Sequence, residues 1–132
     1  MESKNWIDLN ADKIKSDEYF SKLVIQFPAL KKEIENEDCE MIYSRMDIFS
    51  NYSILQIDTK NITELKRCFD FQESLVEKLN SDLINALHVS YCESLLLGKS
   101  AAEMSEIINY MPPKLKTIYI DYENYYIKLA KK

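Results

Sequence analysis

Apolar residues recur every three or four positions along most of this chain, which is the spacing of one face of an α-helix. The residues between them are mainly charged or polar, as expected for helices that bury one side. Prolines, capping residues and polar links divide the pattern into separate segments. It predicts helical segments over residues 16–27, 28–34, 40–55, 61–79, 80–98, 100–111 and 113–132.

Several helix ends carry recognisable capping signals. The words "NITE", from Asn61, and "SAAE", from Ser100, have the spacing of a capping box. Ser16 is expected to cap the first long helix, and Gly98 is expected to close a later one in the left-handed conformation. The proline pair at 112–113 should end one helix and begin the last.

The stretch 51–58 fits two structures. Its alternation of Tyr52, Ile54 and Ile57 would suit a short strand. A lone strand would have no visible partner joined to it by a turn, so a helix is favoured. Links of two to six residues make successive helices antiparallel neighbours.

The resulting fold prediction is all-α: a single domain over residues 1–132, with six to seven antiparallel helices in a bundle or a short α-solenoid of the HEAT type. Residues 1–15 form an N-terminal arm whose structure the pattern does not define. The composition agrees, because 132 residues suit one domain and a single glycine with three prolines leaves little for β-hairpins.

The composition also argues against several classes of function. A single glycine excludes the glycine-rich phosphate loops and the nucleophile elbow of hydrolases. No apolar run approaches the ~20 residues needed to cross a bilayer, and no secretory signal is visible, so a cytoplasmic protein without membrane contact is expected. The single histidine, His88, is interpreted as a satisfied or half-exposed helix residue rather than a catalytic one.

The three cysteines are odd in number and have no C-x-x-C spacing. Cys39, Cys68 and Cys92 are therefore interpreted as reduced core thiols of a cytosolic protein. Zinc is usually bound by four ligands, and the three cysteines and single histidine do not have the sequence spacing of a zinc site. No metal, no cofactor and no catalytic residue is expected, and the chain is not expected to be an enzyme.

A short repeat raises a sharper question, since "FQESLV" from Phe71 and "YCESLL" from Tyr91 share an aromatic residue, a glutamate and Ser-Leu. Glu73 and Glu93 could be half of a metal site, a catalytic carboxylate pair, or parts of two packing units. Carboxylate-bridged di-iron sites require Glu-x-x-His, and neither word contains a histidine. Packing is favoured, with each glutamate at the flank of a buried stripe, capping or pairing with Lys66, Arg67 or Lys78 in a neighbouring turn.

The charge points to a binding function. The net charge is −5, and "EIENEDCE", from Glu33, places five carboxylates in eight positions. Such a run repels phosphate and attracts basic surfaces, which argues against direct nucleic-acid binding. The tyrosine-rich tail adds rigid rings beside acids, a composition typical of protein contacts. The predicted partner-binding residues are Glu33, Glu35, Glu37, Asp38 and Glu40 for steering, with Asp121, Tyr122, Glu123 and Tyr125 as anchors.

Four sequence motifs carry a family resemblance: "FPALKKEI" at 27–34, "LKRCFDFQESL" at 65–75, "ALHVSYCESL" at 86–95 and "MPPKLKTI" at 111–118. With them the chain resembles small bacterial all-helical domains of uncharacterised function. The N-terminal arm, residues 1–15, has no match. The resemblance implies an association with polymorphic toxin or contact-dependent growth inhibition systems, in which small acidic cytosolic proteins serve as immunity factors.

The leading hypothesis is therefore an immunity protein that binds a toxin, most simply a basic nuclease domain, and occludes its active site. The alternative is a helical scaffold or regulatory adaptor that acts through self-association or partner binding. A metal-dependent hydrolase is a third and weaker possibility. The sequence leaves monomer and homodimer open.

Overall fold

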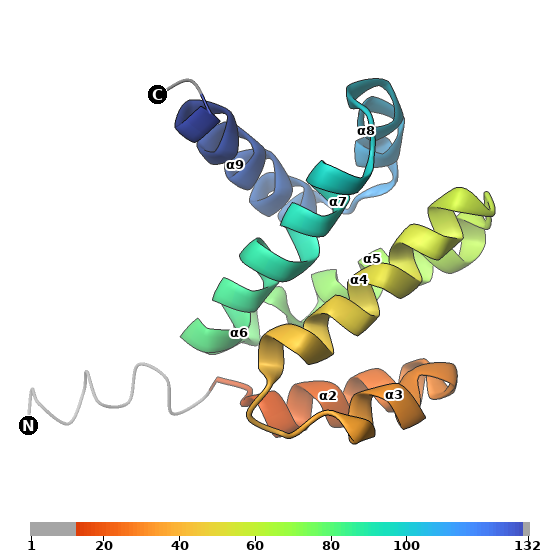
Figure 1. Ribbon diagram of the computed structural model, residues 1–132, viewed down its shortest axis with the longest axis vertical. Helices are drawn as coiled ribbons and strands as arrows, with labels where there is room; N and C mark the ends of the chain where they lie inside the picture. The colour runs from red at the N-terminus through yellow and green to blue at the C-terminus, as the bar shows by residue number, and fades with distance from the viewer. Residues whose placement is uncertain (1–12, 131–132) are drawn as a thin grey trace, which may run out of the picture.

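The structure is a computed structural model that describes residues 13–130, and nearly all of them are helical (Figure 1). The α-helices are α2 (Ser16–Gln26), α3 (Lys31–Asn36), α4 (Ile42–Asp58), α5 (Ile62–Leu75), α6 (Ser81–Ala86), α7 (Glu93–Gly98), α8 (Ala101–Ile107) and α9 (Pro113–Ala130). Three 3-10 turns extend them, Pro28–Leu30, Val76–Lys78 and Ile108–Tyr110, and a π-helix, Leu87–Cys92, joins α6 to α7.

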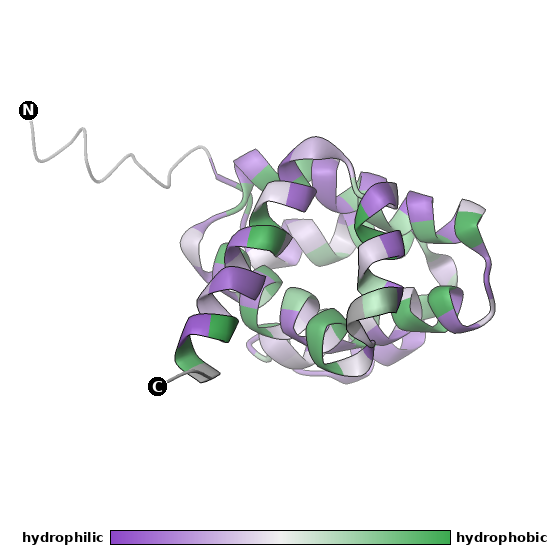
Figure 2. Cartoon of the chain, turned by 90° about the horizontal axis from the view of Figure 1, so that it is seen from above, coloured by the Kyte–Doolittle hydropathy of each residue, from purple (hydrophilic) through white to green (hydrophobic). Residues whose placement is uncertain are grey.

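The prediction of an all-α single domain is confirmed. Between residues 13 and 130 no β-strand forms, and the helical stretches number seven when uninterrupted runs are counted once. In Figure 1, α2 and α3 lie at the bottom, α4 crosses the middle in front of α5, and the run from α6 to α7 climbs toward α8 and α9 at the top. Hydrophilic and hydrophobic segments, purple and green in Figure 2, both occur along the helices, as amphipathic helices require.

Aromatic rings fill the centre of the bundle. Phe49 of α4 is fully buried, and its ring centroid lies 5.3 Å from that of Phe27 and 5.3 Å from that of Tyr91. Phe71 of α5 meets it edge to face at 5.8 Å. These contacts join α4 to the end of α2, to α5 and to the π-helix through one cluster of rings.

The buried polar groups of this core are paired. The Tyr19 hydroxyl donates to Oε1 of Gln72 at 2.7 Å, and the hydroxyls of Tyr91 and Ser53 hydrogen-bond at 2.6 Å. In the part of the chain described here, every buried side-chain nitrogen or oxygen atom has a partner. Unpaired buried groups are costly, so this pairing is what allows polar side chains inside the bundle.

Residues 51–58 are helical, as favoured from the sequence, because they belong to the continuous helix α4. The buried side of α4 runs through Met46, Phe49, Ser53 and Gln56. Two of these are polar, whereas Leu55 stays exposed. The apolar alternation that resembled a strand therefore does not mark the buried side of the helix.

The capping predictions have mixed outcomes. The Ser100 box is complete, since Glu103 N–H donates to Oγ of Ser100 at 3.2 Å and Ser100 N–H donates to Oε1 of Glu103 at 3.1 Å. Asn61 accepts from Glu64 N–H at 3.2 Å, but the Glu64 carboxylate does not return to Asn61. It accepts instead from the Tyr52 hydroxyl and from the Arg67 guanidinium.

Two cap predictions are wrong. Lys15, not Ser16, is the N-cap of α2, and no side chain caps that end. The reason is that Ile14 is fixed in extended pairing: its N–H donates to the Lys78 carbonyl at 2.7 Å, so the helix begins directly after it. Gly98 has no positive φ, because the chain passes through the extended Lys99 into the next cap.

Of the predicted arm 1–15, only residues 13–15 belong to the described part. Residues 1–12 lie outside it, and so do residues 131–132 of the last predicted helix.

Among the described residues, the left-handed backbone conformation is adopted by a lysine rather than by a glycine. Lys60 has φ 59° and follows α4. Its N–H donates to the Ile57 carbonyl at 3.1 Å, and Asn61 N–H donates to the Gln56 carbonyl at 2.8 Å. This double closure is the Schellman arrangement, in which glycine is the preferred residue at the left-handed position.

Lys60→Gly is therefore expected to stabilise the protein. Removing Cβ relieves the left-handed strain, and glycine's greater freedom in the unfolded chain offsets part of that gain, leaving about 0.5–1 kcal/mol in the free energy of unfolding. Urea denaturation followed by circular dichroism measures it. Lys60→Ala is the matched control because it removes the same side chain and keeps Cβ. An equal gain for alanine would contradict the argument.

A candidate protein-binding groove between the π-helix and α9

The π-helix Leu87–Cys92 is the most unusual backbone segment of the fold. π-helical segments are rare and often occur at functional sites. Here the segment buries Leu87, Tyr91 and Cys92 in the core, where Tyr91 meets the Phe49 ring. Ser90 is buried as well, whereas two residues turn outward: His88 is half-buried and Val89 is exposed.

Helix α9 packs against the π-helix and supplies the opposite wall. Tyr122 stacks on His88 with ring centroids 6.1 Å apart and an interplanar angle of 22°. The Tyr125 ring lies 6.1 Å from that of Tyr122, tilted by 45°, and Tyr125 is 57% exposed. The walls enclose an open groove of about 350 Å³, lined by Asn85, His88, Val89, Asp121, Tyr122 and Tyr125.

The two glutamates of the sequence repeat both hold α9. The Glu73 carboxylate accepts the N–H groups of Lys114 at 3.2 Å and Leu115 at 2.8 Å, so it caps the first turn of α9. Glu93 accepts from the Tyr122 hydroxyl at 3.1 Å and fixes that ring. The repeat is a pair of anchor points on α5 and α7, and the capping of α9 by Glu73 agrees with the packing interpretation. Among the described residues, neither glutamate forms the expected ion pair with Lys66, Arg67 or Lys78.

The groove is acidic around a neutral histidine. Burial lowers the pKa of His88, and the Asp121 carboxylate opposes this only in part. Burial and then the hydrogen bond to Glu93 raise the pKa of Tyr122 to about 12, so the phenol stays protonated and keeps donating. On the neighbouring helix α4, burial raises the pKa of Asp47, the Ser90 hydroxyl opposes the shift and the charge of Glu93 adds to it.

The predicted anchors fall mostly in one place. Asp121, Tyr122 and Tyr125 line the groove together. Glu123 does not line it, because its carboxylate accepts from the Tyr119 hydroxyl at 3.3 Å on another side of α9. Of the predicted tyrosine anchors, Tyr125 is the exposed one, at 57%.

The predicted steering residues lie elsewhere. Glu33 and Glu35 are on α3, and Glu37, Asp38 and Glu40 are in the link from α3 to α4. All are exposed except Glu37, which is half-buried and whose carbonyl accepts from Arg45. Figure 1 shows α3 at the bottom of the molecule and α9 at the top. The acidic run and the tyrosines therefore do not form one continuous surface.

Sequence reasoning missed the π-helix side of the groove. Asn85 and Val89 carried no signal, and His88 was interpreted as an ordinary helix residue. Its half-buried state agrees with that interpretation, but its stack on Tyr122 gives it a place in the groove wall. Only the pairing of one histidine with a tyrosine-rich tail could have suggested it.

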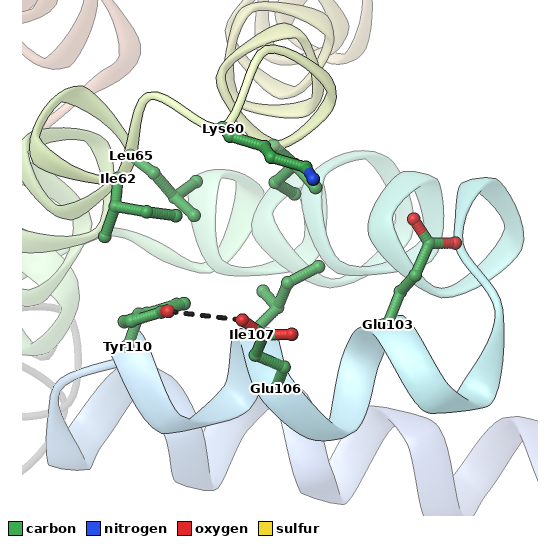
Figure 3. Close-up of a pocket in the computed structure, with 8 residues that line it drawn as sticks. Lys60, Ile62, Leu65, Glu103, Glu106, Ile107 and Tyr110 are labelled. Carbon is green, nitrogen blue, oxygen red and sulfur yellow. Dashed lines mark hydrogen bonds between the residues drawn. The ribbon is translucent and has the colours of Figure 1, made fainter.

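A second hollow, shown in Figure 3, lies between the α4–α5 corner and α8. Ile62, Leu65 and Ile107 give it an apolar floor, and Lys60 and Glu106 stand at its rim. The Tyr110 hydroxyl donates to the Glu106 carboxylate at 3.4 Å. Its charges are mixed, and its other carboxylate, Glu103, is used in the helix cap, so it favours no single ligand charge.

The cysteines are free in the structure. Cys68 and Cys92 are buried, and burial raises the pKa of each thiol to about 12, so they stay protonated. Cys39 corrects the expectation of three core thiols, because it is exposed in the link between α3 and α4, where the acidic run offers little apolar cover.

Metal ligation and membrane crossing both lack support within residues 13–130. No three His, Cys, Asp or Glu side chains gather there in a way that could hold a metal ion. No helix of that span combines the length and apolar character that crossing a membrane requires.

A family model described as "Domain of unknown function (DUF7674)" matches residues 20–127. No curated protein and no solved structure matches the chain. The matched region contains the whole groove and both glutamate anchors.

Proposed function

The chain belongs to the DUF7674 family, and we propose that it works by binding a basic segment of a protein partner in the groove between the π-helix and α9. The observation that carries this proposal is the joint placement of Tyr122, Tyr125 and the Asp121 carboxylate on one groove wall. The proposed activity is occlusion of the partner, with no bond made or broken.

The physical basis is that of a small interface hot spot. Tyrosine gives a large contact area with few rotatable bonds, so ordering it on binding costs little entropy. Tyr122 is already held by Glu93 and His88, which reduces that cost further. Asp121 is exposed beside these rings and would select a basic group over an acidic one.

The finer proposal is an immunity protein that neutralises a bacterial toxin, most simply a basic nuclease domain, in the cytoplasm. Its support is the family resemblance given above and the net charge of −5. The acidic run of Glu33 to Glu40, whose carboxylates are exposed except that of the half-buried Glu37, lies away from the groove, so it would attract the partner over a distance rather than contact it there. Long-range attraction raises the association rate and fades with salt.

Binding to the protein encoded by the adjacent gene tests this role. Isothermal titration calorimetry or surface plasmon resonance at about 50 mM and about 500 mM salt measures the affinity for this partner. The affinity is expected to fall about tenfold at the higher salt, because screening increases. Tyr125→Ala should weaken binding by a similar factor, whereas Tyr110→Ala, a ring outside the groove, should not. Affinity that ignores salt would discard the electrostatic mechanism, and absence of binding would discard the role.

One observation favours the alternative of a self-associating scaffold. Tyr125, Ile127 and Leu129 are 57%, 43% and 50% exposed on the last turns of α9. Light scattering decides between the two: a stable oligomer that Tyr125→Ala converts to monomer would replace the partner-capture proposal.

A further inference from the structure

We propose that the groove recognises an arginine side chain, with the guanidinium lying against the Tyr122 and Tyr125 rings and pairing with the Asp121 carboxylate. This inference rests on the proposed function and names the group that the partner presents.

The rings of the groove are suited to a cation. An aromatic face carries negative potential, and cations within about 6 Å of the ring centroid are attracted to it. Because the Tyr122 hydroxyl donates to the Glu93 carboxylate, electron density shifts toward its ring and strengthens that potential. Tyr125 provides a second ring 6.1 Å away, tilted by 45°, so the two rings form a continuous aromatic surface against which a flat group can lie.

The charges around the groove point the same way. None of its lining residues within the described chain is a lysine or arginine, and Asp121 contributes a carboxylate. His88 adds no positive charge near neutral pH, because its burial against Tyr122 disfavours the charged form and lowers its pKa. A cation entering the groove would therefore meet attraction from the carboxylate and the rings without local repulsion.

The protein already uses this arrangement inside its own fold. The Arg67 guanidinium lies 4.6 Å from the Phe27 ring centroid and donates to the Glu64 carboxylate at 2.7 Å. It also donates to the Gln26 carbonyl. The groove offers the same combination of ring, carboxylate and amide oxygen, through Tyr122, Asp121 and Asn85. None of the residues that line it supplies a guanidinium of its own to occupy this position.

Arginine fits better than lysine for two reasons. The guanidinium is planar and weakly hydrated, so it stacks on rings at a smaller desolvation cost than an ammonium. Its several N–H donors can reach a carboxylate and an amide oxygen at once, whereas the compact ammonium acts as a point charge. In this groove, the two tilted rings suit stacking by a planar guanidinium, and the carboxylate suits its several N–H donors.

The test uses the full chain, labelled with nitrogen-15, and three peptides: acetyl-Gly-Arg-Gly-amide, its lysine counterpart and its citrulline counterpart. The arginine peptide is expected to shift the amide signals of residues 88–89 and 121–125 in a saturable way. The lysine peptide should bind several-fold more weakly, and the citrulline peptide should not bind. Asp121→Asn should weaken arginine binding about tenfold, which is the scale of a charge-assisted pair.

Asp70→Asn is the matched control, because it removes one exposed carboxylate from α5 without touching the groove. Equal binding of the arginine and lysine peptides, shifts outside the groove, or an Asp121→Asn variant that binds normally would overturn the inference. If the whole partner binds through Tyr125 while no arginine peptide binds, the arginine inference fails and the proposed function stands. If neither binds, both fail.

Discussion

Phe49→Ala is expected to lower the free energy of unfolding by about 3–5 kcal/mol, which is the usual cost of removing a buried phenylalanine ring. Phe49 is fully buried and touches the rings of Phe27, Phe71 and Tyr91. Its loss leaves a cavity where α4 meets three other helical segments, which cannot all move inward together. Since small domains are typically stable by about 5–15 kcal/mol, much of the folded population would be lost on mild heating.

Urea denaturation monitored by circular dichroism at 222 nm measures this effect. Phe49→Leu is the conservative control, because it keeps most of the volume and should cost less than half as much. Tyr125→Ala removes an equally large but exposed ring and should change stability by no more than about 0.5 kcal/mol. A loss below about 1 kcal/mol for Phe49→Ala would mean that the core does not depend on this ring cluster.

The helices were predictable because their apolar spacing is a local property of the sequence. The exception is informative: α4 buries Ser53 and Gln56 and leaves Leu55 exposed. Ser53 is buried because Tyr91, on another helix, offers its hydroxyl a partner. A polar residue in a core position cannot be identified from the sequence when the group that satisfies it comes from 38 residues away.

The helix ends show the same limit on a smaller scale. Gly98 was the natural choice for a left-handed cap, yet Lys60 holds the positive φ. The Cβ of a residue at 98 would meet only Ile54 Cδ1, at 3.7 Å, so neither space nor backbone angle demands glycine there. The next helix starts after two residues, and its Ser100 cap determines how the chain leaves α7.

The candidate site was half predictable. Tyrosines beside acids on α9 indicated a contact surface, and Asp121, Tyr122 and Tyr125 do share the groove. The other wall could not be predicted, because periodicity analysis assumes an α-helix and Leu87–Cys92 is a π-helix. The acidic run is dense in sequence, but it is carried by α3 and its link and does not reach this groove.

The repeat that contains Glu73 and Glu93 shows what a local sequence pattern can predict and what it cannot. Their equal positions in two similar motifs predicted that each lies on a helix, and they are found on α5 and α7. The groups that they hold, at the start of α9 and at Tyr122, are 41 and 29 residues away in the chain. Nothing in the local spacing encodes such distant partners, which depend on how α9 folds back over α5 and the π-helix.

Glu73→Ala is expected to cost about 1–2 kcal/mol in the free energy of unfolding, because α9 then loses its side-chain cap. Pro113 has no N–H, so the first free donors of α9 belong to Lys114 and Leu115, and both go to the Glu73 carboxylate. Without it, the Leu115 N–H is left without a partner beside the core. The start of α9 would loosen, and the groove wall that it carries would be less well ordered.

Matched variants separate the cap from a general charge effect. Glu73→Gln keeps an oxygen acceptor and should lose clearly less stability than Glu73→Ala. Glu77→Ala removes a carboxylate one turn later that pairs with the Lys114 ammonium in full solvent, and it should have a much smaller effect. Equal losses for Glu73→Ala and Glu77→Ala in urea denaturation would contradict the capping role. If the cap acts as argued, Glu73→Ala should also weaken partner binding although Glu73 lies outside the groove, because Tyr122 and Tyr125 depend on the helix that it anchors.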